Sequence, residues 1–373
     1  MESVPGGLVI KYRVDGVLAR VGGVQGTELA EQAVSRLKVL AELDIAERRV
    51  PQDGRFKVQA GGRAIDFRVS IMPSIHGEDA VLRILDKEHL TRELAGLSLD
   101  TLGFDATTRA RLRHMAAEPY GMLLVTGPTG SGKTTSLYAL LSETHTGQDK
   151  VITIEDPVEY QLPGVLQIPV NERKGLTFAR GLRSILRHDP DRVMVGEIRD
   201  AETAQIAVQA ALTGHLVFST LHTNDSASAI TRLADLGVPP YLISATVIGV
   251  LAQRLARTLC PACKVRDGDT NRETLDGLAQ PWRLGGGLRP HKAVGCLACR
   301  NTGFRGRVGL YELMVMDDAA RRAVHPAQDM AALRRQALAE GMRALRLAGL
   351  MKVAEGSTTV DEILRATPAW QEN

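Results

Sequence analysis

Apolar and polar positions over the first 95 residues predict a small α+β domain. Residues 8–10, 56–58 and 65–69 form short runs rich in β-branched and aromatic side chains, a pattern typical of strands. Residues 28–49 predict a helix, because their apolar side chains fall roughly on one face. That face consists of Leu29, Ala33, Leu37, Leu40 and Ile45. Strands around one or two helices indicate an N-terminal α+β domain over residues 1–95.

The pattern changes after a connector at residues 96–105. The residues that interrupt the pattern there are Gly96, Ser98, Gly103 and Asp105. Farther on, apolar runs alternate with stretches that predict helices, which is typical of parallel strands buried on both faces. The runs lie at 122–125, 151–154, 193–195 and 216–218. We therefore expect an α/β domain over residues 106–373, ending in a helical region over residues 317–373.

Composition and charge narrow the function without naming it. The 373 residues are 44% hydrophobic, enough for the cores of two or three domains. A formal net charge of +3 and an aromatic content of 4% give no indication of nucleic-acid binding. No stretch reaches the roughly 18 consecutive apolar residues of a membrane-spanning helix, and no signal peptide is recognisable. We expect a cytosolic protein that meets a membrane only through a partner.

A phosphate-binding loop with the spacing G-x-x-x-x-G-K-T follows the apolar run at 122–125. Glycines let backbone N–H groups approach phosphate oxygens, and the dipole of the following helix favours an anion. Lys133 supplies positive charge for the β- and γ-phosphates, and the Thr134 hydroxyl can bind Mg²⁺. A chance glycine-rich turn would lack the strand before it and the helix after it. The candidate nucleotide-binding residues are Gly127, Pro128, Thr129, Gly130, Ser131, Gly132, Lys133, Thr134 and Thr135.

Two further strand ends carry acidic residues. The third apolar run leads to Glu197, as a Walker B strand should, and the second leads to Glu155, Asp156 and Glu159. Glu197 could hold the water shell of Mg²⁺ or the attacking water. Acids at strand ends are commonly solvated or capping groups. Two such ends beside a phosphate loop instead favour a hydrolytic site.

Arginines are candidates for bidentate phosphate contacts. Arg180, Arg183 and Arg187 fall at helical spacing before the Walker B strand, whereas Arg68 and Arg83 lie in the first domain. Taken singly, each of these arginines is more commonly a solvated surface residue.

All four cysteines fall in two C-x-x-C pairs within an insertion at residues 258–304. Cys260 and Cys263 are separated from Cys296 and Cys299 by 32 residues. In a cytosolic chain this pattern predicts a closed tetrahedral zinc site of the structural type. Free buried thiols and a thioredoxin-like redox motif are the alternatives.

The motifs and their order resemble one family over nearly the whole chain. In the first domain they are Pro51-Gln52-Asp53-Gly54-Arg55, Asp66-Phe67-Arg68-Val69-Ser70, His76-Gly77-Glu78 and Leu82-Arg83-Ile84-Leu85. After the phosphate loop come an "Asp box" at 154–160, a signature at 186–200, a "His box" at 213–223, Gln253-Arg254-Leu255 and Tyr311-Glu312. The chain thus resembles the ATPases of type II secretion and type IV pilus assembly.

The resemblance implies a RecA-like P-loop NTPase core with ATP, Mg²⁺ and Zn²⁺ as cofactors. By analogy, Glu159 would activate the attacking water, and Glu197 and Thr134 would lie at Mg²⁺. His222 would contact the γ-phosphate, although a lone histidine is more often structural. The implied phosphate-contacting arginines are Arg68, Arg83, Arg183 and Arg187.

The resemblance also implies a ring-shaped homohexamer whose first domain moves against the ATPase core. Its partners would be an inner-membrane platform protein and a membrane recruiter with a cytoplasmic domain, with no nucleic acid. The protein would be cytoplasmic and peripherally associated with the inner membrane. Family members carry a further domain before the strand that ends at Val14. We therefore expect this chain to be N-terminally truncated or to dock differently.

Three alternative functions stay open. A pilus retraction motor is disfavoured by the four cysteines, since retraction ATPases of this class generally lack them. A nucleic-acid translocase on a RecA-like core is disfavoured by the near-neutral charge and the scarce aromatics. A nucleotide-binding regulator without turnover would show no hydrolysis that depends on Lys133.

Overall fold

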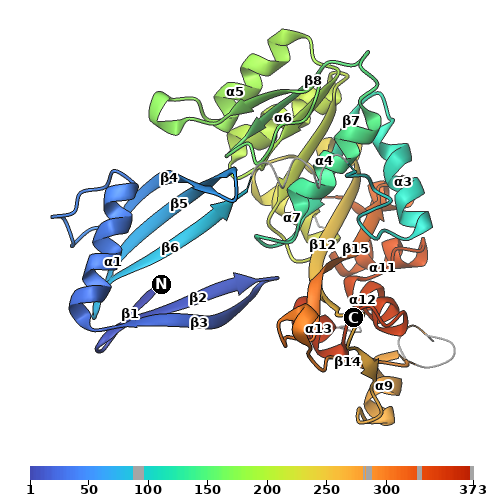
Figure 1. Ribbon diagram of the computed structural model, residues 1–373. Helices are drawn as coiled ribbons and strands as arrows, with labels where there is room; N and C mark the ends of the chain where they lie inside the picture. The colour runs from blue at the N-terminus through green and yellow to red at the C-terminus, as the bar shows by residue number, and fades with distance from the viewer. Residues whose placement is uncertain (87–95, 280–281, 283–287, 326–329, 370–373) are drawn as a thin grey trace. The chain divides into compact units, whose positions relative to one another are not determined.

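The computed structural model describes residues 1–86, 96–279, 282, 288–325 and 330–369. The chain divides into two compact units, Met1–Gly96 and Leu97–Asn373. Each unit has its own hydrophobic core. Figure 1 shows the elements of both units.

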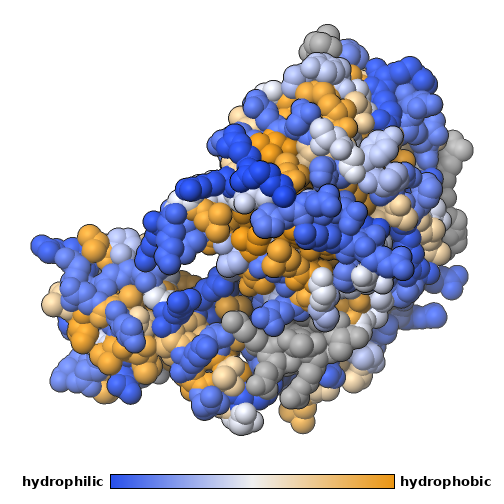
Figure 2. Space-filling view, turned by 90° about the horizontal axis from the view of Figure 1, so that it is seen from above, coloured by the Kyte–Doolittle hydropathy of each residue, from blue (hydrophilic) through white to orange (hydrophobic). Residues whose placement is uncertain are grey.

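The described residues of the first unit form two antiparallel three-stranded sheets and one helix, α1 (Thr27–Leu40). One sheet contains β1 (Glu2–Val4), β2 (Gly7–Val14) and β3 (Val17–Gln25). The other contains β4 (Gln52–Ala60), β5 (Arg63–Ser74) and β6 (Gly77–Leu85). The strands expected at 8–10, 56–58 and 65–69 are therefore present. Large hydrophobic side chains remain exposed on this unit, among them Tyr12, Val14, Leu18 and Val21 on β2 and β3. Figure 2 shows hydrophobic residues interspersed with hydrophilic ones on the face of the molecule that it draws.

The helix predicted over residues 28–49 is shorter than its apolar pattern indicated. Helix α1 ends at Leu40, because Glu42 adopts a left-handed conformation with φ 57°. The Asp44 carboxylate then accepts a hydrogen bond from the backbone N–H of Ala46 at 2.8 Å. A side chain that satisfies nearby backbone groups favours a turn over a continued helix.

The buried face of α1 also differs from the predicted one. Leu29 and Ile45 are exposed, and the fully buried positions are Ala30, Val34 and Lys38. The Lys38 ammonium is neutralised, since it pairs with Glu78 at 2.5 Å. A lysine can occupy a buried position when its charge is paired in this way, which a purely apolar pattern does not anticipate.

The second unit is built on a seven-stranded sheet with the order β15-β12-β7-β11-β10-β8-β9. Its strands are β7 (Gly121–Thr126), β8 (Val151–Glu155), β9 (Leu166–Pro169), β10 (Arg192–Val195), β11 (Leu216–Leu221), β12 (Val247–Leu259) and β15 (Phe304–Val315). The strands from β12 to β9 are parallel, and β15 pairs antiparallel with β12 at the edge. The four predicted apolar strands are the central ones.

Helices cover this sheet and form the C-terminal region (Figure 1). They are α3 (Ala106–Ala116), α4 (Lys133–Thr144), α5 (Phe178–Ile185), α6 (Ala201–Leu212), α7 (Ser226–Asp235), α8 (Pro240–Thr246), α9 (Arg272–Ala279), α10 (Asp318–Ala323), α11 (Met330–Ala339), α12 (Leu345–Ala354) and α13 (Val360–Ala366). Helices α10 to α13 confirm the helical C-terminal region. Short strands β13 (Val265–Arg266) and β14 (His291–Lys292) pair within the cysteine insertion. Within the described part of the chain, no helix combines the length and apolar character needed to span a bilayer.

The core of the second unit explains why its strands read as continuous apolar runs. Met122, Leu123, Leu124 and Val125 of β7 are all fully buried, as expected for a parallel strand covered on both faces. Strand β8 follows β7 in sequence but lies three places away in the sheet. This reversal makes a crevice at the carboxyl ends of the strands, where α/β proteins bind ligands.

Candidate nucleotide site and tetracysteine cluster

The carboxyl ends of the central strands bring the predicted site residues to one edge of the sheet. The loop after β7 leads directly into α4, which begins at Lys133. Glu155 ends β8, Glu197 follows β10 and His222 follows β11. Four segments that are far apart in sequence thus meet at this edge.

The glycines of the phosphate loop are required by its conformation. Gly127 and Gly132 have φ values of 150° and 86°, which residues other than glycine rarely adopt. A Cβ atom on Gly127 would lie 2.5 Å from the backbone oxygen of Gln253, and one on Gly132 would lie 2.8 Å from Nε2 of Gln253. The loop is therefore packed directly against β12.

Lys133 turns back onto the loop that precedes it. Its Nζ donates hydrogen bonds to the backbone oxygens of Gly127 at 2.8 Å and of Pro128 at 3.2 Å. Burial lowers the pKa of Lys133 to about 8, while the charge of Glu197 acts in the opposite direction. An anion in the loop would stabilise the charged ammonium.

The loop also presents polar groups suited to a polyphosphate. The Ser131 hydroxyl is buried and has no hydrogen-bond partner among the described residues. Thr134 and Thr135 lie partly buried in the first turn of α4, where free backbone N–H groups and the helix dipole favour anions. These residues fit the triphosphate of a nucleotide, and the Thr134 hydroxyl fits a ligand of its Mg²⁺.

Glu197 and His222 face each other at this edge. Nε2 of His222 lies 3.4 Å from a carboxylate oxygen of Glu197, whose other oxygen pairs with Arg199. Burial, together with the charge of Lys133, lowers the pKa of His222. The histidine is thus held mainly neutral at neutral pH, so that it can donate a hydrogen bond without adding a charge.

Glu155, the first acid of the Asp box, is buried and held by hydrogen bonds. Its side chain accepts hydrogen bonds from the Tyr138 hydroxyl, from the Thr153 hydroxyl at 2.6 Å and from the Gln167 amide at 3.1 Å. Only 2% of Glu155 is exposed. A carboxylate so fully engaged is not free to act on water, whereas Glu159, half-buried in the loop that follows, makes no ion pair with any described residue.

Gln253 of β12 is a site residue to which the sequence pattern assigned no role. Its Nε2 donates a hydrogen bond to the backbone oxygen of Ser131 at 2.7 Å, and its Oε1 accepts one from the Ser136 hydroxyl at 2.8 Å. The side chain is buried. It therefore braces both the phosphate loop and the first turns of α4, a role that only the three-dimensional structure reveals.

We expect Gln253→Leu to lower the free energy of unfolding by about 2–4 kcal/mol, because two buried polar groups lose their partners. ATP affinity should fall as well, since the loop loses its brace. Chemical unfolding and nucleotide titration would measure both effects. Gln209→Leu, at an exposed position of α6, is the matched control. Equal stability of the two variants would contradict the bracing role.

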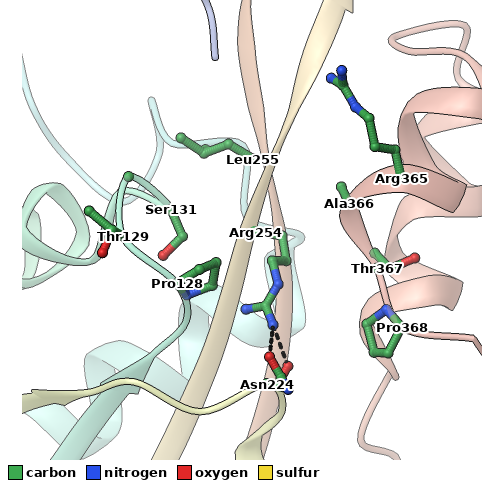
Figure 3. A pocket seen from close by; sticks show the side chains of 11 residues that line it. Pro128, Thr129, Ser131, Asn224, Arg254, Leu255, Arg365, Ala366, Thr367 and Pro368 are labelled. Carbon is green, nitrogen blue, oxygen red and sulfur yellow. Dashed lines mark hydrogen bonds between the residues drawn. The ribbon is translucent and has the colours of Figure 1, made fainter. Parts of the chain in front are cut away.

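A pocket of about 510 Å³ lies beside the phosphate loop. Pro128, Thr129 and Ser131 lie on one side of it, and the end of α13 lies on the other (Figure 3). Arg254 reaches across its floor and donates a hydrogen bond to the backbone oxygen of Asn224 at 2.7 Å. Burial lowers the pKa of the Arg254 guanidinium.

The predicted phosphate-contacting arginines are not gathered in the described site. Arg183 pairs with Glu202 at 2.5 Å, and exposed Arg187 donates to the backbone oxygen of Arg183 at 3.0 Å. Arg68 and Arg83 belong to the first unit, where they are direct partners on β5 and β6. Their roles toward a nucleotide stay predictions.

The four cysteines converge on one point. The sulfur atoms of Cys260, Cys263, Cys296 and Cys299 lie within 4.8 Å of one another. Three of the separations are 3.7, 3.8 and 3.9 Å, close to the roughly 3.8 Å that four sulfurs 2.3 Å from a zinc ion would show. The backbone N–H groups of Cys296 and Gly303 also donate to Sγ of Cys299. The donor set and its spacing fit a structural zinc ion.

A phosphate loop, a carboxylate and a histidine at the crevice of a parallel sheet define the class of P-loop ATPases. Residues 2–365 match the family described as Type II/IV secretion system protein. The chain therefore belongs to this family, and it is an ATPase. This confirms the resemblance and the fold expected from the sequence.

Known relatives support this assignment. The Type II secretion system protein HxcR of Pseudomonas aeruginosa is 52% identical over 360 residues, which are 96% of this chain and 71% of that protein. The Type II secretion system ATPase E of Vibrio cholerae is 49% identical over 374 residues, or 98% of this chain and 71% of that protein.

Solved structures share the fold. The pilus retraction motor PilT with bound ADP has a TM-score of 0.61 at 27% identity, covering 98% of this chain and 92% of that one. The Legionella pneumophila ATPase DotB has a TM-score of 0.64 at 20% identity, covering 96% of this chain and 90% of that one.

Proposed function

We propose that the chain is an ATP-hydrolysing motor that powers fibre assembly in type II secretion, the pseudopilus, or in type IV pilus biogenesis. The observation that carries the proposal is the meeting of Lys133, Glu197 and His222 at one sheet edge in a member of this family. Relatives near 50% identity are type II secretion proteins. They favour the secretion role over retraction, the role of the less similar PilT.

Each residue of the site has a chemical task in this proposal. Lys133 and the loop amides would hold the β- and γ-phosphates, and Thr134 and Glu197 would hold Mg²⁺. Bound Mg²⁺ would neutralise charge on the phosphates. Glu159 would orient and deprotonate the attacking water, since its carboxylate forms no ion pair with any described residue. His222 donates a hydrogen bond to the γ-phosphate.

The four arginines would reach this site from a neighbouring subunit or from the first unit. Arg183 and Arg187 lie on the exposed surface of the second unit, so a neighbouring subunit of a ring could meet them. Arg68 and Arg83 would be brought to the nucleotide when the first unit moves. We propose a homohexamer, because a ring could bring the exposed Arg183 and Arg187 of one subunit to the nucleotide of its neighbour.

The working location would be the cytoplasmic face of the inner membrane. There the ring would act on an inner-membrane platform protein, with recruitment by a membrane protein that has a cytoplasmic domain. The zinc ion would hold the insertion between β12 and β15 in a fixed shape.

A turnover assay separates this motor from a nucleic-acid translocase. We expect purified protein to release phosphate from MgATP, more per chain at concentrations where rings form, and not to respond to DNA. The Lys133→Ala variant sets the baseline. The net charge of +3 leaves little driving force for DNA binding. Tight, salt-dependent DNA binding that stimulates turnover would overturn the proposal, and turnover no higher than that of Lys133→Ala would remove the enzyme claim.

A further inference from the structure

Residues 97–105 of the connector belong to the second unit and pack into it. Leu99 is fully buried, and its backbone N–H donates a hydrogen bond to a carboxylate oxygen of Glu143 on α4 at 2.6 Å. The Phe104 ring is buried as well. This part of the connector is therefore held by specific contacts with the ATPase unit.

Tyr311 on β15 holds the end of the connector. Its ring stacks on that of Phe104 with the centroids 3.7 Å apart, and its hydroxyl donates a hydrogen bond to the backbone oxygen of Leu102 at 2.8 Å. The ring folds back over Gly309, two positions earlier on the same strand. A Cβ atom on Gly309 would lie 2.1 Å from the Tyr311 hydroxyl oxygen. The glycine thus leaves the space through which Tyr311 reaches the connector.

Tyr311 is also a neighbour of Gln253, the residue that braces the phosphate loop. The two are direct partners on β15 and β12, so their side chains share one face of the sheet. The Ser136 hydroxyl, which donates to Oε1 of Gln253 at 2.8 Å, contacts Tyr311 too. Burial raises the pKa of the Tyr311 hydroxyl, and the hydrogen bond with Ser136 acts in the opposite direction. Three adjacent polar side chains thus join the phosphate loop to the connector.

The loop cannot change its conformation without affecting Gln253. Nε2 of Gln253 donates to the backbone oxygen of Ser131 at 2.7 Å, and it lies so close to Gly132 that a Cβ atom there would be 2.8 Å away. Phosphates bound in the loop would restrict the motion of its backbone. A side chain packed against an ordered backbone loses freedom as well, and it restricts its own neighbours in turn.

We propose that Tyr311 is a positioning residue that couples a nucleotide in the phosphate loop to the connector, through Gln253 and Ser136. A bound nucleotide orders this network and tightens the hold of Tyr311 on residues 97–105. The coupling is reciprocal, so that a firmly held connector raises the nucleotide affinity by the same factor. The inference rests on the ATPase function proposed above and uses only contacts within the second unit.

The test measures hydrogen–deuterium exchange of residues 97–105 in the full chain, with and without saturating MgADP. The backbone N–H groups of Leu99 and Thr101 are hydrogen-bonded, so their exchange reports opening of the connector. We expect MgADP to slow this exchange at least about fivefold in the wild-type protein, the lower end of ordinary coupling between sites. In Tyr311→Phe, which keeps the ring and loses the hydroxyl, MgADP should leave the exchange rate nearly unchanged.

Arg343→Gln is the matched control. Arg343 pairs with Asp105 at 3.2 Å, so its loss loosens the same connector without touching the polar network. Exchange should become faster both with and without MgADP, and the ratio of the two rates should stay that of the wild type. Ser136→Ala removes the hydroxyl between Gln253 and Tyr311. It should abolish the effect of MgADP as Tyr311→Phe does, which keeps the test available if Tyr311→Phe does not fold.

The outcomes separate this inference from the function on which it rests. If Tyr311→Phe speeds exchange equally with and without MgADP, Tyr311 has only a structural role and the inference is overturned. It is also overturned if MgADP binds the wild-type protein without slowing exchange in residues 97–105, while phosphate release from MgATP would still support the ATPase function. A wild-type protein that neither binds MgADP nor hydrolyses MgATP would remove the proposed function and the inference together.

Discussion

Glu159→Gln is expected to keep ATP bound and to lower its turnover by about 10²- to 10⁴-fold. A positioned general base contributes an effect of this size, and glutamine keeps the shape of the side chain while losing its basicity. Phosphate release under saturating MgATP measures turnover, and titration with a fluorescent nucleotide measures binding. The two readings together separate a catalytic loss from a damaged pocket.

Glu155 of the same Asp box provides a control for the Glu159 variant. Glu155→Gln would leave donors of Tyr138, Thr153 and Gln167 facing a side chain with a single acceptor oxygen. We expect that variant to lose about 1–3 kcal/mol of stability and to retain more activity than Glu159→Gln. Unchanged turnover in Glu159→Gln would clear Glu159 of a catalytic role and leave Glu197 as the candidate base.

Cys260→Ser is expected to release the metal and to unfold the insertion between β12 and β15. Intact protein should contain about one zinc per chain, and the variant close to none. Structural zinc binds small zinc-finger peptides by about 10–16 kcal/mol at neutral pH, so an insertion with little apolar core of its own depends on it. Metal analysis and limited proteolysis within residues 260–303 would report the two effects.

Leu297→Ser is the matched control for this experiment. Leu297 lies in the short turn between Cys296 and Cys299 and is 91% exposed, so its loss should affect neither the metal nor protease resistance. A metal-free wild-type protein that stays folded and resistant to protease would refute the structural zinc site.

The sequence predicted most of the ATPase fold, because its strongest signals are local. The runs at 122–125 and 193–195 are buried on both faces, and such strands leave a continuous apolar pattern. Helix α1 was harder, because its end depends on a left-handed residue, Glu42, and its buried face includes the paired Lys38. Neither feature changes apolar periodicity.

The site was predictable only where a motif is contiguous. The phosphate loop is a single segment, so its spacing identified it. Gln253 acts through contacts with residues more than 100 positions earlier in the chain, which no local pattern encodes. The register that aligns Arg68 with Arg83 likewise depends on strand pairing, and a shift of one residue would have placed them on opposite faces of the sheet.

Strand β12 connects the phosphate loop to the metal cluster. It carries Gln253 against the phosphate loop and, after its last residue Leu259, continues directly into Cys260 of the metal cluster. Seven residues of extended chain place these two points about 23 Å apart, and the antiparallel partner β15 stiffens the strand between them. The paired strands β12 and β15 therefore form a stiff connection between the metal cluster at one end and the phosphate loop at the other. A force applied to the cysteine insertion would be transmitted to the phosphate loop. Release of the phosphates from the loop would in turn be transmitted to the insertion.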